Sequence, residues 1–266
     1  MRTILSRIGE ISLIFILSLF LNFTGTAEEG LIYEIRAGNA HLARRVMGDV
    51  TEKVGDVPAV PVDSFTWNGE GYQSIEGKAY ARLDPVNNTG EIKVIWKDKH
   101  GNWELEQTVF LKSPMPLGVR FGPSIDSKEI IQDAIITNAY MHGDTGAVDP
   151  MLPVLFAYIG TWGTARVTLN GKPFENPFDG PVPDWLVHSM LVTGVYDQKG
   201  RVTVQGGEIY DPSKSSRGVT DFSDLEYQLI FLDAPGDENT SIPPIFKFAY
   251  HLIFEDVELK IQQKGN

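Results

Sequence analysis

The sequence predicts an all-β protein, either an antiparallel β-sandwich or a jelly roll, with one or two short helices. Short segments alternate polar and apolar side chains along much of the chain, which is typical of half-buried strands. Joints rich in glycine and proline separate these segments, and the 266 residues include 26 Gly and 16 Pro. Segments with helical periodicity are few and short.

The clearest element is a β-hairpin formed by residues 91–96 and 103–110. Both segments alternate polar and apolar side chains, and residues 97–102 between them have turn composition, with Gly101 free to adopt a positive φ. Pairing across this turn places five side chains on one buried face: Ile92, Val94, Trp96, Trp103 and Leu105.

Two further hairpins are expected. Residues 155–159 and 165–169 form one around a glycine-containing joint at 160–163, and Asn170-Gly171 then marks another turn. Residues 185–196 and 201–204 form the other.

Two long strands follow, at 225–232 and 246–260. In the second, alternate positions define a core face made of Phe246, Phe248, Tyr250, Leu252 and Phe254.

Short helices are expected at Asn39–Val50 and Ser127–Ile136. Leu42 and Val46 are spaced for one helix face, and Ser127 is a suitable N-cap. Both segments are rich in β-branched residues, so strands are the alternative.

Residues 1–27 have the pattern of a secretory signal peptide. Arg2 and Arg7 flank the start, an apolar run covers 11–23, and small residues precede a cut after Ala27. The run is shorter than the roughly 20 residues that span a bilayer, which favours cleavage over an uncleaved anchor or a core helix. We expect export to the periplasm or extracellular space, with no membrane span after signal cleavage.

The remainder, 28–266, is expected to form a single all-β domain. Gly- and Pro-rich sequence breaks the periodicity near 112–124, so a division into two smaller β domains at this point is the alternative.

Composition excludes several functional classes. The net charge of −12 argues against nucleic acid as a partner, because phosphate neutralisation needs a basic surface. The absence of Cys excludes disulfides, iron–sulfur clusters and thiol nucleophiles. Phosphate-binding, zinc-protease and serine-hydrolase motifs are also absent, which favours binding over catalysis.

A polar segment at 140–150 suggests a metal site. His142, Asp144 and Asp149 offer nitrogen and oxygen ligands for a divalent metal. If 186–193 is a strand, His188 and Met190 share a face, and an imidazole with a thioether suits copper. The alternatives are a solvated loop and, for Met190, ordinary core filling.

Three tryptophans lie in loop-like sequence contexts: Trp67, Trp162 and Trp185. Tryptophans on loops with Asn and Asp nearby can stack on a sugar ring while the polar groups bind its hydroxyls. The alternative is that these rings plug the ends of the sandwich.

Together these patterns predict an exported, non-catalytic binding protein of the cell envelope, with a carbohydrate as its ligand. A metal-dependent envelope protein, whether for trafficking or catalysis, is the first alternative, using His142, Asp144, His188 and Met190. A structural or assembly subunit of the cell surface, with an envelope protein as partner, is the second.

Overall fold

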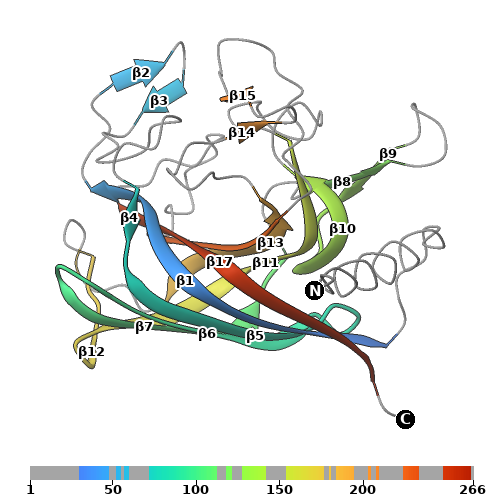
Figure 1. The fold of residues 1–266 in the computed structure, drawn as a ribbon, viewed down its shortest axis with the longest axis horizontal. Coiled ribbons are helices and arrows are strands. Elements are labelled where there is room, and N and C mark those ends of the chain that lie inside the picture. The colour runs from blue at the N-terminus through green and yellow to red at the C-terminus, as the bar shows by residue number, and fades with distance from the viewer. Residues whose placement is uncertain are drawn as a thin grey trace, which may run out of the picture.

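A computed structural model shows the fold of the chain (Figure 1). It describes residues 30–47, 52–54, 57–59, 72–112, 118–121, 128–141, 154–176, 180, 184–194, 203–204, 208–209, 224–233 and 248–264. All regular structure within these ranges is β-strand, and none of it is an apolar helix long enough to cross a bilayer. The strands are β1 (Leu31–Met47), β2 (Glu52–Val54), β3 (Val57–Ala59), β4 (Gln73–Ser74), β5 (Glu76–Asp84), β6 (Thr89–Asp98), β7 (Gly101–Phe110), β8 (Gly118–Phe121), β9 (Lys128–Ile131), β10 (Ile135–Met141), β11 (Leu155–Leu169), β12 (Lys172–Pro173), β13 (Trp185–Thr193), β14 (Thr203–Val204), β15 (Glu208–Ile209), β16 (Leu225–Leu232) and β17 (Phe248–Gln263).

Eight antiparallel strands close into a barrel in the order β13-β16-β17-β1-β5-β6-β7-β11, and β11 pairs back to β13 (Figure 1). The expected all-β, antiparallel character is confirmed, but the expected sandwich or jelly roll is wrong. Alternation of polar and apolar residues fits the wall of a barrel as well as a sandwich face. The closing ladder between β11 and β13 distinguishes the two, and no local sequence pattern encodes it.

The barrel wall branches at β11. The first half of this strand pairs with β10, ending at Thr161 opposite Ile135, and the second half pairs with β7 from Gly163 opposite Phe110. On the β10 side the sheet continues through β8 to β9. The hairpin expected within 155–169 is therefore wrong, because the chain runs through Gly160 and Gly163 as one strand. The turn at Asn170-Gly171 is confirmed, with φ angles of 53° and 74°.

The two expected helices are wrong over the described residues. Residues 39–47 belong to β1, residues 128–131 form β9, and Ile135 and Ile136 begin β10. Leu42 and Val46 are four residues apart, a spacing that fits both the helical and the strand period. The β1 backbone pairs with β17 along almost its whole length, which decides between the two.

The hairpin expected at 91–110 and the long strands expected at 225–232 and 246–260 are confirmed as β6–β7, β16 and β17. The hairpin expected between 185–196 and 201–204 is wrong, since β13 pairs with β11 and β16, whereas β14 pairs with β15. Strands on both sides of the 112–124 segment belong to the same sheet.

Large aromatic side chains fill the barrel interior, and the five side chains expected on the hairpin face are all buried there. Phe248, Tyr250, Leu252 and Phe254 form the interior face of β17. Phe246 lies outside the described residues.

Candidate functional site

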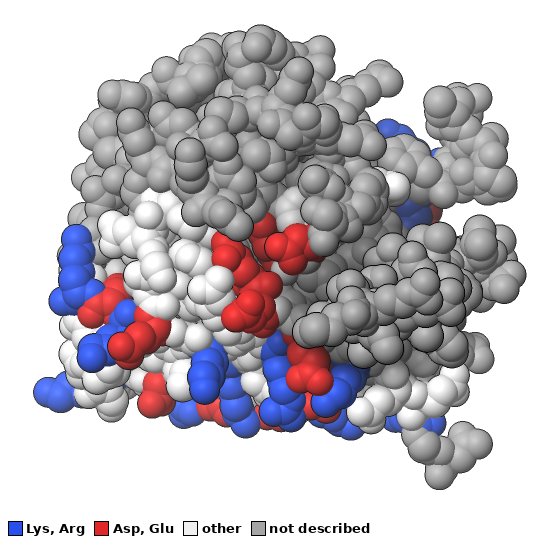
Figure 2. Space-filling model, viewed as in Figure 1, with Lys and Arg blue, Asp and Glu red and all other residues white. Residues whose placement is uncertain are grey.

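The outer face of the barrel over β17, β1, β5 and β6 is covered by charged side chains of alternating sign. One lateral row runs from Glu258 through Arg36 and Tyr80 to Lys93, as the strand register shows. Figure 2 shows Lys and Arg interleaved with Asp and Glu along the lower edge of the molecule, where these strands run. Opposite charges on adjacent strands stabilise the pairing and keep the face hydrated.

The neighbouring row contains a gap. It runs from Asp256 through Gly38 to Lys78 and Ile95, and Gly38 contributes no side chain. A Cβ atom at Gly38 would have only the Cβ of Asp256 within 4 Å, at 4.0 Å, so the space above it is open. Ile95 is 54% exposed and gives this row one large aliphatic side chain among the charges.

Two adjacent strands change face at this point, which shapes the gap. Ala37 and Ala40 of β1 both lie in the core, although they are three residues apart. Asn39 between them has a φ of 47°, a conformation that asparagine tolerates better than most residues. On β17, Phe254 and Val257 likewise both pack on the core. Asp256 is therefore turned outward beside Gly38.

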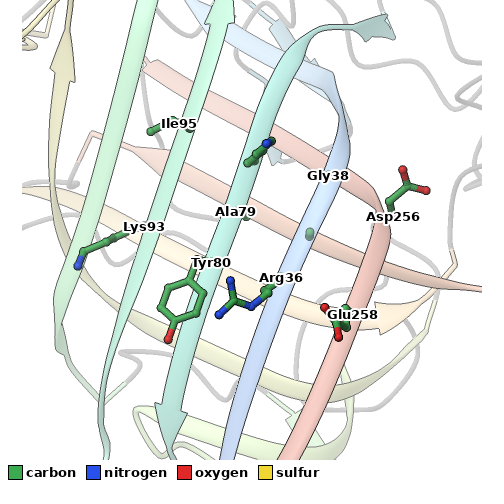
Figure 3. Close-up of a pocket in the computed structure, with 10 residues that line it drawn as sticks. Arg36, Gly38, Ala79, Tyr80, Lys93, Ile95, Asp256 and Glu258 are labelled. Carbon is green, nitrogen blue, oxygen red and sulfur yellow. The ribbon is translucent and has the colours of Figure 1, made fainter.

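The result is a hollow of about 540 Å³ on the outer surface (Figure 3). This volume is within the range of small-ligand sites. It is lined by six charged or aromatic residues and three small or aliphatic ones, and most of the surface that they turn to the hollow is apolar: Arg36, Lys78, Tyr80, Lys93, Asp256 and Glu258, with Gly38, Ala79 and Ile95. We refer to it as the outer groove.

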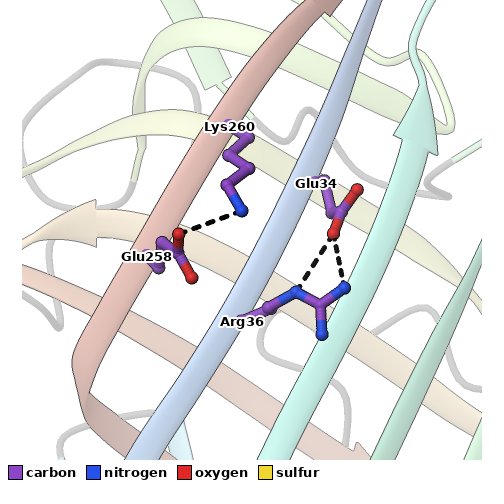
Figure 4. Close-up of polar contacts among 4 residues, drawn as sticks. All are labelled: Glu34, Arg36, Glu258 and Lys260. Atoms are coloured by element: carbon purple, nitrogen blue, oxygen red, sulfur yellow. Dashed lines mark hydrogen bonds and ion pairs between the residues drawn. The ribbon is translucent and has the colours of Figure 1, made fainter.

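Two of the groove cations, those of Arg36 and Lys93, are held by carboxylates on their own strands. Arg36 donates to Oε1 of Glu34 from Nε at 3.1 Å and from Nη2 at 2.7 Å. Lys93 donates to Oε2 of Glu91 at 2.7 Å. These hydrogen bonds, with the attraction of each carboxylate, raise the pKa of both Arg36 and Lys93, so both remain cationic. On the neighbouring strand β17, Lys260 pairs with Glu258 at 3.1 Å, and Figure 4 shows this ion pair beside that of Arg36 with Glu34.

The guanidinium of Arg36 also lies over the ring of Tyr80, with Cζ 5.2 Å from the ring centroid. This cation–π contact orients both side chains at the wall of the groove. Figure 3 shows the Tyr80 ring on the outer surface between Arg36 and Lys93.

Lys78 and Asp256 face the groove from opposite sides of Gly38. Within the part of the chain that the structure describes, neither side chain forms an ion pair. The groove therefore presents one ammonium donor and one carboxylate acceptor that the other described residues leave without an ion pair.

A hydrogen-bonded cluster supports the bend beside the groove. Glu255 accepts a hydrogen bond from Nδ2 of Asn39 at 2.7 Å and one from the hydroxyl of Tyr72 at 2.8 Å. His41 stacks on Tyr72, with ring centroids 4.6 Å apart. These contacts tie β1 to β17 where both strands change face, and so fix the separation of Gly38 and Asp256.

Two of the three tryptophans expected on loops lie in strands, Trp162 in β11 and Trp185 in β13. Trp185 is 1% exposed in the barrel core, and Trp162 is 7% exposed in a second cluster on the outer side of β11. Both belong to strands, and neither ring presents a face to solvent for stacking on a sugar. Trp67 lies outside the described residues.

Of the five residues expected to bind a metal, the structure describes two. His142, Asp144 and Asp149 lie outside the described residues. His188 and Met190 are buried on the outer face of β13, and the strand predicted there is confirmed. Among the described residues, no three His, Asp or Glu side chains converge as metal ligands.

The outer groove was not predicted from the sequence. Its one local signal is Ile95, which occupies an outward position between Lys93 and Lys97 on an otherwise regular strand. The contribution of Gly38 and Asp256 depends on the change of face in two strands far apart in sequence.

Comparison with known proteins adds no relative, since no family model, no curated protein and no solved structure matches the chain.

Proposed function

We propose that this protein is an exported, non-catalytic carbohydrate-binding protein of the cell envelope, and that the outer groove holds the sugar. The observation that carries the proposal is the half-buried Tyr80 ring between the guanidinium of Arg36 and the ammonium of Lys93, in a hollow that Asp256 also lines. The signal-peptide pattern of residues 1–27 supports export.

The polar groups of the groove favour a hydroxylated ligand over a simple ion. A sugar hydroxyl both donates and accepts hydrogen bonds, so it can accept from Lys78 while another donates to Asp256. A small anion is repelled by Asp256, and a small cation by Lys78. A sugar ring also has an apolar face of C–H groups that can pack on Tyr80 and Ile95.

The groove is open, and local ion pairs hold two of its cationic side chains in place. A ligand can therefore bind without a large rearrangement of the protein. Arg36 and Lys93 are already oriented by Glu34 and Glu91, so less side-chain entropy is lost when a ligand binds. A preformed site of this kind predicts modest but selective affinity.

The test is an array of neutral and acidic oligosaccharides probed with the purified protein, followed by calorimetry on the best ligand. Tyr80→Leu removes the ring, Lys78→Gln removes the donor, and Gly38→Val fills the gap with a residue suited to a strand. We expect each to weaken binding by about tenfold or more, which corresponds to about 1.4 kcal/mol.

Lys172→Gln is the matched control, because Lys172 is an exposed lysine on β12 that does not line the groove. It should bind as the wild type does. If the wild type retains no glycan, or if all three groove variants bind normally while unfolding at the wild-type temperature, the proposal is wrong.

A further inference from the structure

A second buried cluster, on the outer face of β11 and β13, brings two methionines to a stacked tryptophan and histidine. Met141 and Met190 belong to this cluster together with Trp162. The ring of His188 stacks on Trp162, with centroids 4.6 Å apart and planes 15° from parallel. The four side chains come from β10, β11 and β13, and the outer groove uses none of them.

The strand register sets these side chains next to one another. Gly160 lies opposite Met190, and Trp162 lies opposite His188, two positions along the same ladder and on the same face. Facing side chains of an antiparallel pair have Cβ atoms about 5 Å apart. Because Gly160 has no side chain, it leaves room for a third group.

The thioether of Met141 and the side chain of Ile136 share that room. Sδ of Met141 and Cγ1 of Ile136 each lie 3.3 Å from the position that a Cβ of Gly160 would take. The sulfur therefore lies over Gly160, the residue that faces Met190 in the ladder, and His188 is two residues from Met190 on the same face. Two thioethers and one imidazole thus occupy neighbouring positions on one face of the sheet.

His188 is oriented as metal-binding histidines are. Its Nδ1 lies 2.8 Å from the backbone carbonyl oxygen of Thr161. A carbonyl oxygen only accepts, so Nδ1 carries the proton and the lone pair is on Nε2. Donation from one ring nitrogen to a backbone carbonyl fixes the tautomer and raises the basicity of the other nitrogen.

From this arrangement we propose that Met141, Met190 and His188 bind a monovalent copper ion, with Trp162 against it. Thioether and imidazole ligands are soft and neutral, and they select Cu(I) over harder divalent ions. A single positive charge is also less costly to bury than a double one. The Trp162 ring adds a cation–π contact at a site where all four side chains are less than 10% exposed.

The test is an anaerobic titration of the purified protein with Cu(I) in competition with a chromophoric chelator, repeated with Ag(I) as a redox-inert analogue. We expect one ion per chain and quenching of tryptophan fluorescence on binding. X-ray absorption of the copper-loaded protein should show sulfur and nitrogen neighbours.

Met141→Leu, Met190→Leu and His188→Gln each remove one ligand while nearly conserving volume. Each should weaken Cu(I) binding by more than about tenfold. The matched controls are Met47→Leu, on β1 and three strands from β13, and His100→Gln, in the exposed β6–β7 turn. Both controls should bind as the wild type does.

The wild-type titration and absorption spectrum require no variant to fold. Failure of the wild type to take Cu(I) from the chelator overturns the proposal. A copper environment of nitrogen and oxygen alone, or wild-type affinity in all three ligand variants, overturns it as well. None of these outcomes bears on the outer groove, whose residues are separate.

Discussion

Trp96 and Trp103 stack face to face across the β6–β7 hairpin, with ring centroids 5.3 Å apart and ring planes 4° from parallel. Asp98, at the end of the same hairpin, accepts hydrogen bonds from Nε1 of Trp103 at 2.8 Å and from the hydroxyl of Tyr250 at 3.0 Å. One carboxylate thus joins the β6–β7 hairpin to β17, the last strand of the barrel.

Asp98→Ala should lower the free energy of unfolding by about 2 kcal/mol, because it leaves two largely buried donors without an acceptor. Urea unfolding followed by tryptophan fluorescence measures the change. Lys99→Ala, at the adjacent exposed turn position, is the control and should cost less than about 0.5 kcal/mol. Equal effects of the two variants would show that the Asp98 hydrogen bonds contribute nothing.

A chain of hydrogen-bonded hydroxyl groups lies inside the barrel. It makes the free energy of unfolding decrease at alkaline pH. Tyr227 donates to Oγ of Ser189 at 3.1 Å, and Ser189 lies 2.9 Å from Oγ1 of Thr161. Burial raises the pKa of Tyr227 well above its ordinary value of 10.0, and the hydrogen bond to Ser189 only partly opposes this.

The folded state therefore keeps the Tyr227 proton at a pH where the unfolded state loses it. The stability contributed by this group is complete below pH 10 and is lost as the pH rises above it. The difference in unfolding free energy between wild type and Tyr227→Phe should shift by about 1 kcal/mol between pH 10 and pH 11, against the wild type. Guanidinium titrations at several pH values measure it, and a difference that does not vary with pH would contradict the expectation.

Gly163 marks the point where β11 changes partner from β10 to β7, and the wall leaves no room there for a side chain. A Cβ at this position would overlap the carbonyl oxygen of Val109 and would lie 2.6 Å from Nε2 of Gln107. We expect Gly163→Ala to cost about 3 kcal/mol or more, as overpacking against backbone does.

Gly171→Ala is the comparison variant, since no atom lies within 4 Å of its would-be Cβ and only its φ of 74° opposes the change. It should cost about 1 kcal/mol. Thermal unfolding of both variants tests the ordering, and a milder effect at Gly163 than at Gly171 would refute it.

Asp84 is the last residue of β5 and lies at the opposite end of the β5–β6 pair from Asp98. It accepts from Nζ of Lys264 at 2.6 Å and from Nδ2 of Asn87 at 2.8 Å. Burial acts to raise the pKa of Asp84, but the hydrogen bonds from Lys264 and Asn87 outweigh it, and the pKa lies below its ordinary value of 3.8.

A lowered carboxyl pKa contributes stability above the unfolded value and loses it as the pH falls through the folded one. Asp84→Asn should therefore lower the free energy of unfolding at pH 7 by about 1 kcal/mol, a modest amount because Lys264 is half-exposed. The difference in unfolding free energy between Asp84→Asn and the wild type should become smaller below pH 3.8. Glu104→Gln on the exposed face of β7 is the control, and a difference that persists at low pH would contradict this account.

The sequence predicts individual strands of this fold well and their partners poorly. Alternation identified the β6–β7 hairpin and the interior face of β17, because burial on one face of a strand is a local property. Closure of the barrel depends on β11 reaching β13, and β1 reaching β17, which no local pattern describes. Gly160 and Gly163 suggested a turn, yet both lie inside one strand, where a side chain at Gly163 would overlap the backbone of Val109.

The candidate sites were likewise predictable where they depend on one strand and not where they depend on strand pairing. The shared face of His188 and Met190 was predictable from alternation, whereas the approach of Met141 depends on the pairing of β10 with β11. The outer groove depends on Gly38 and Asp256, from the first and last strands of the barrel. A site built by register between distant strands becomes visible only when that register is known.

The pairing of β1 with β17 also governs the order in which the molecule can form. This ladder extends from Leu31 opposite Gln263 to Met47 opposite Phe248, so it joins the beginning of the barrel to its end. Contacts of such long sequence separation form late and slow the folding of a domain. Until β17 has been synthesised, β1 retains an open hydrogen-bonding edge, and the nascent chain is most vulnerable to association with other strands during that interval.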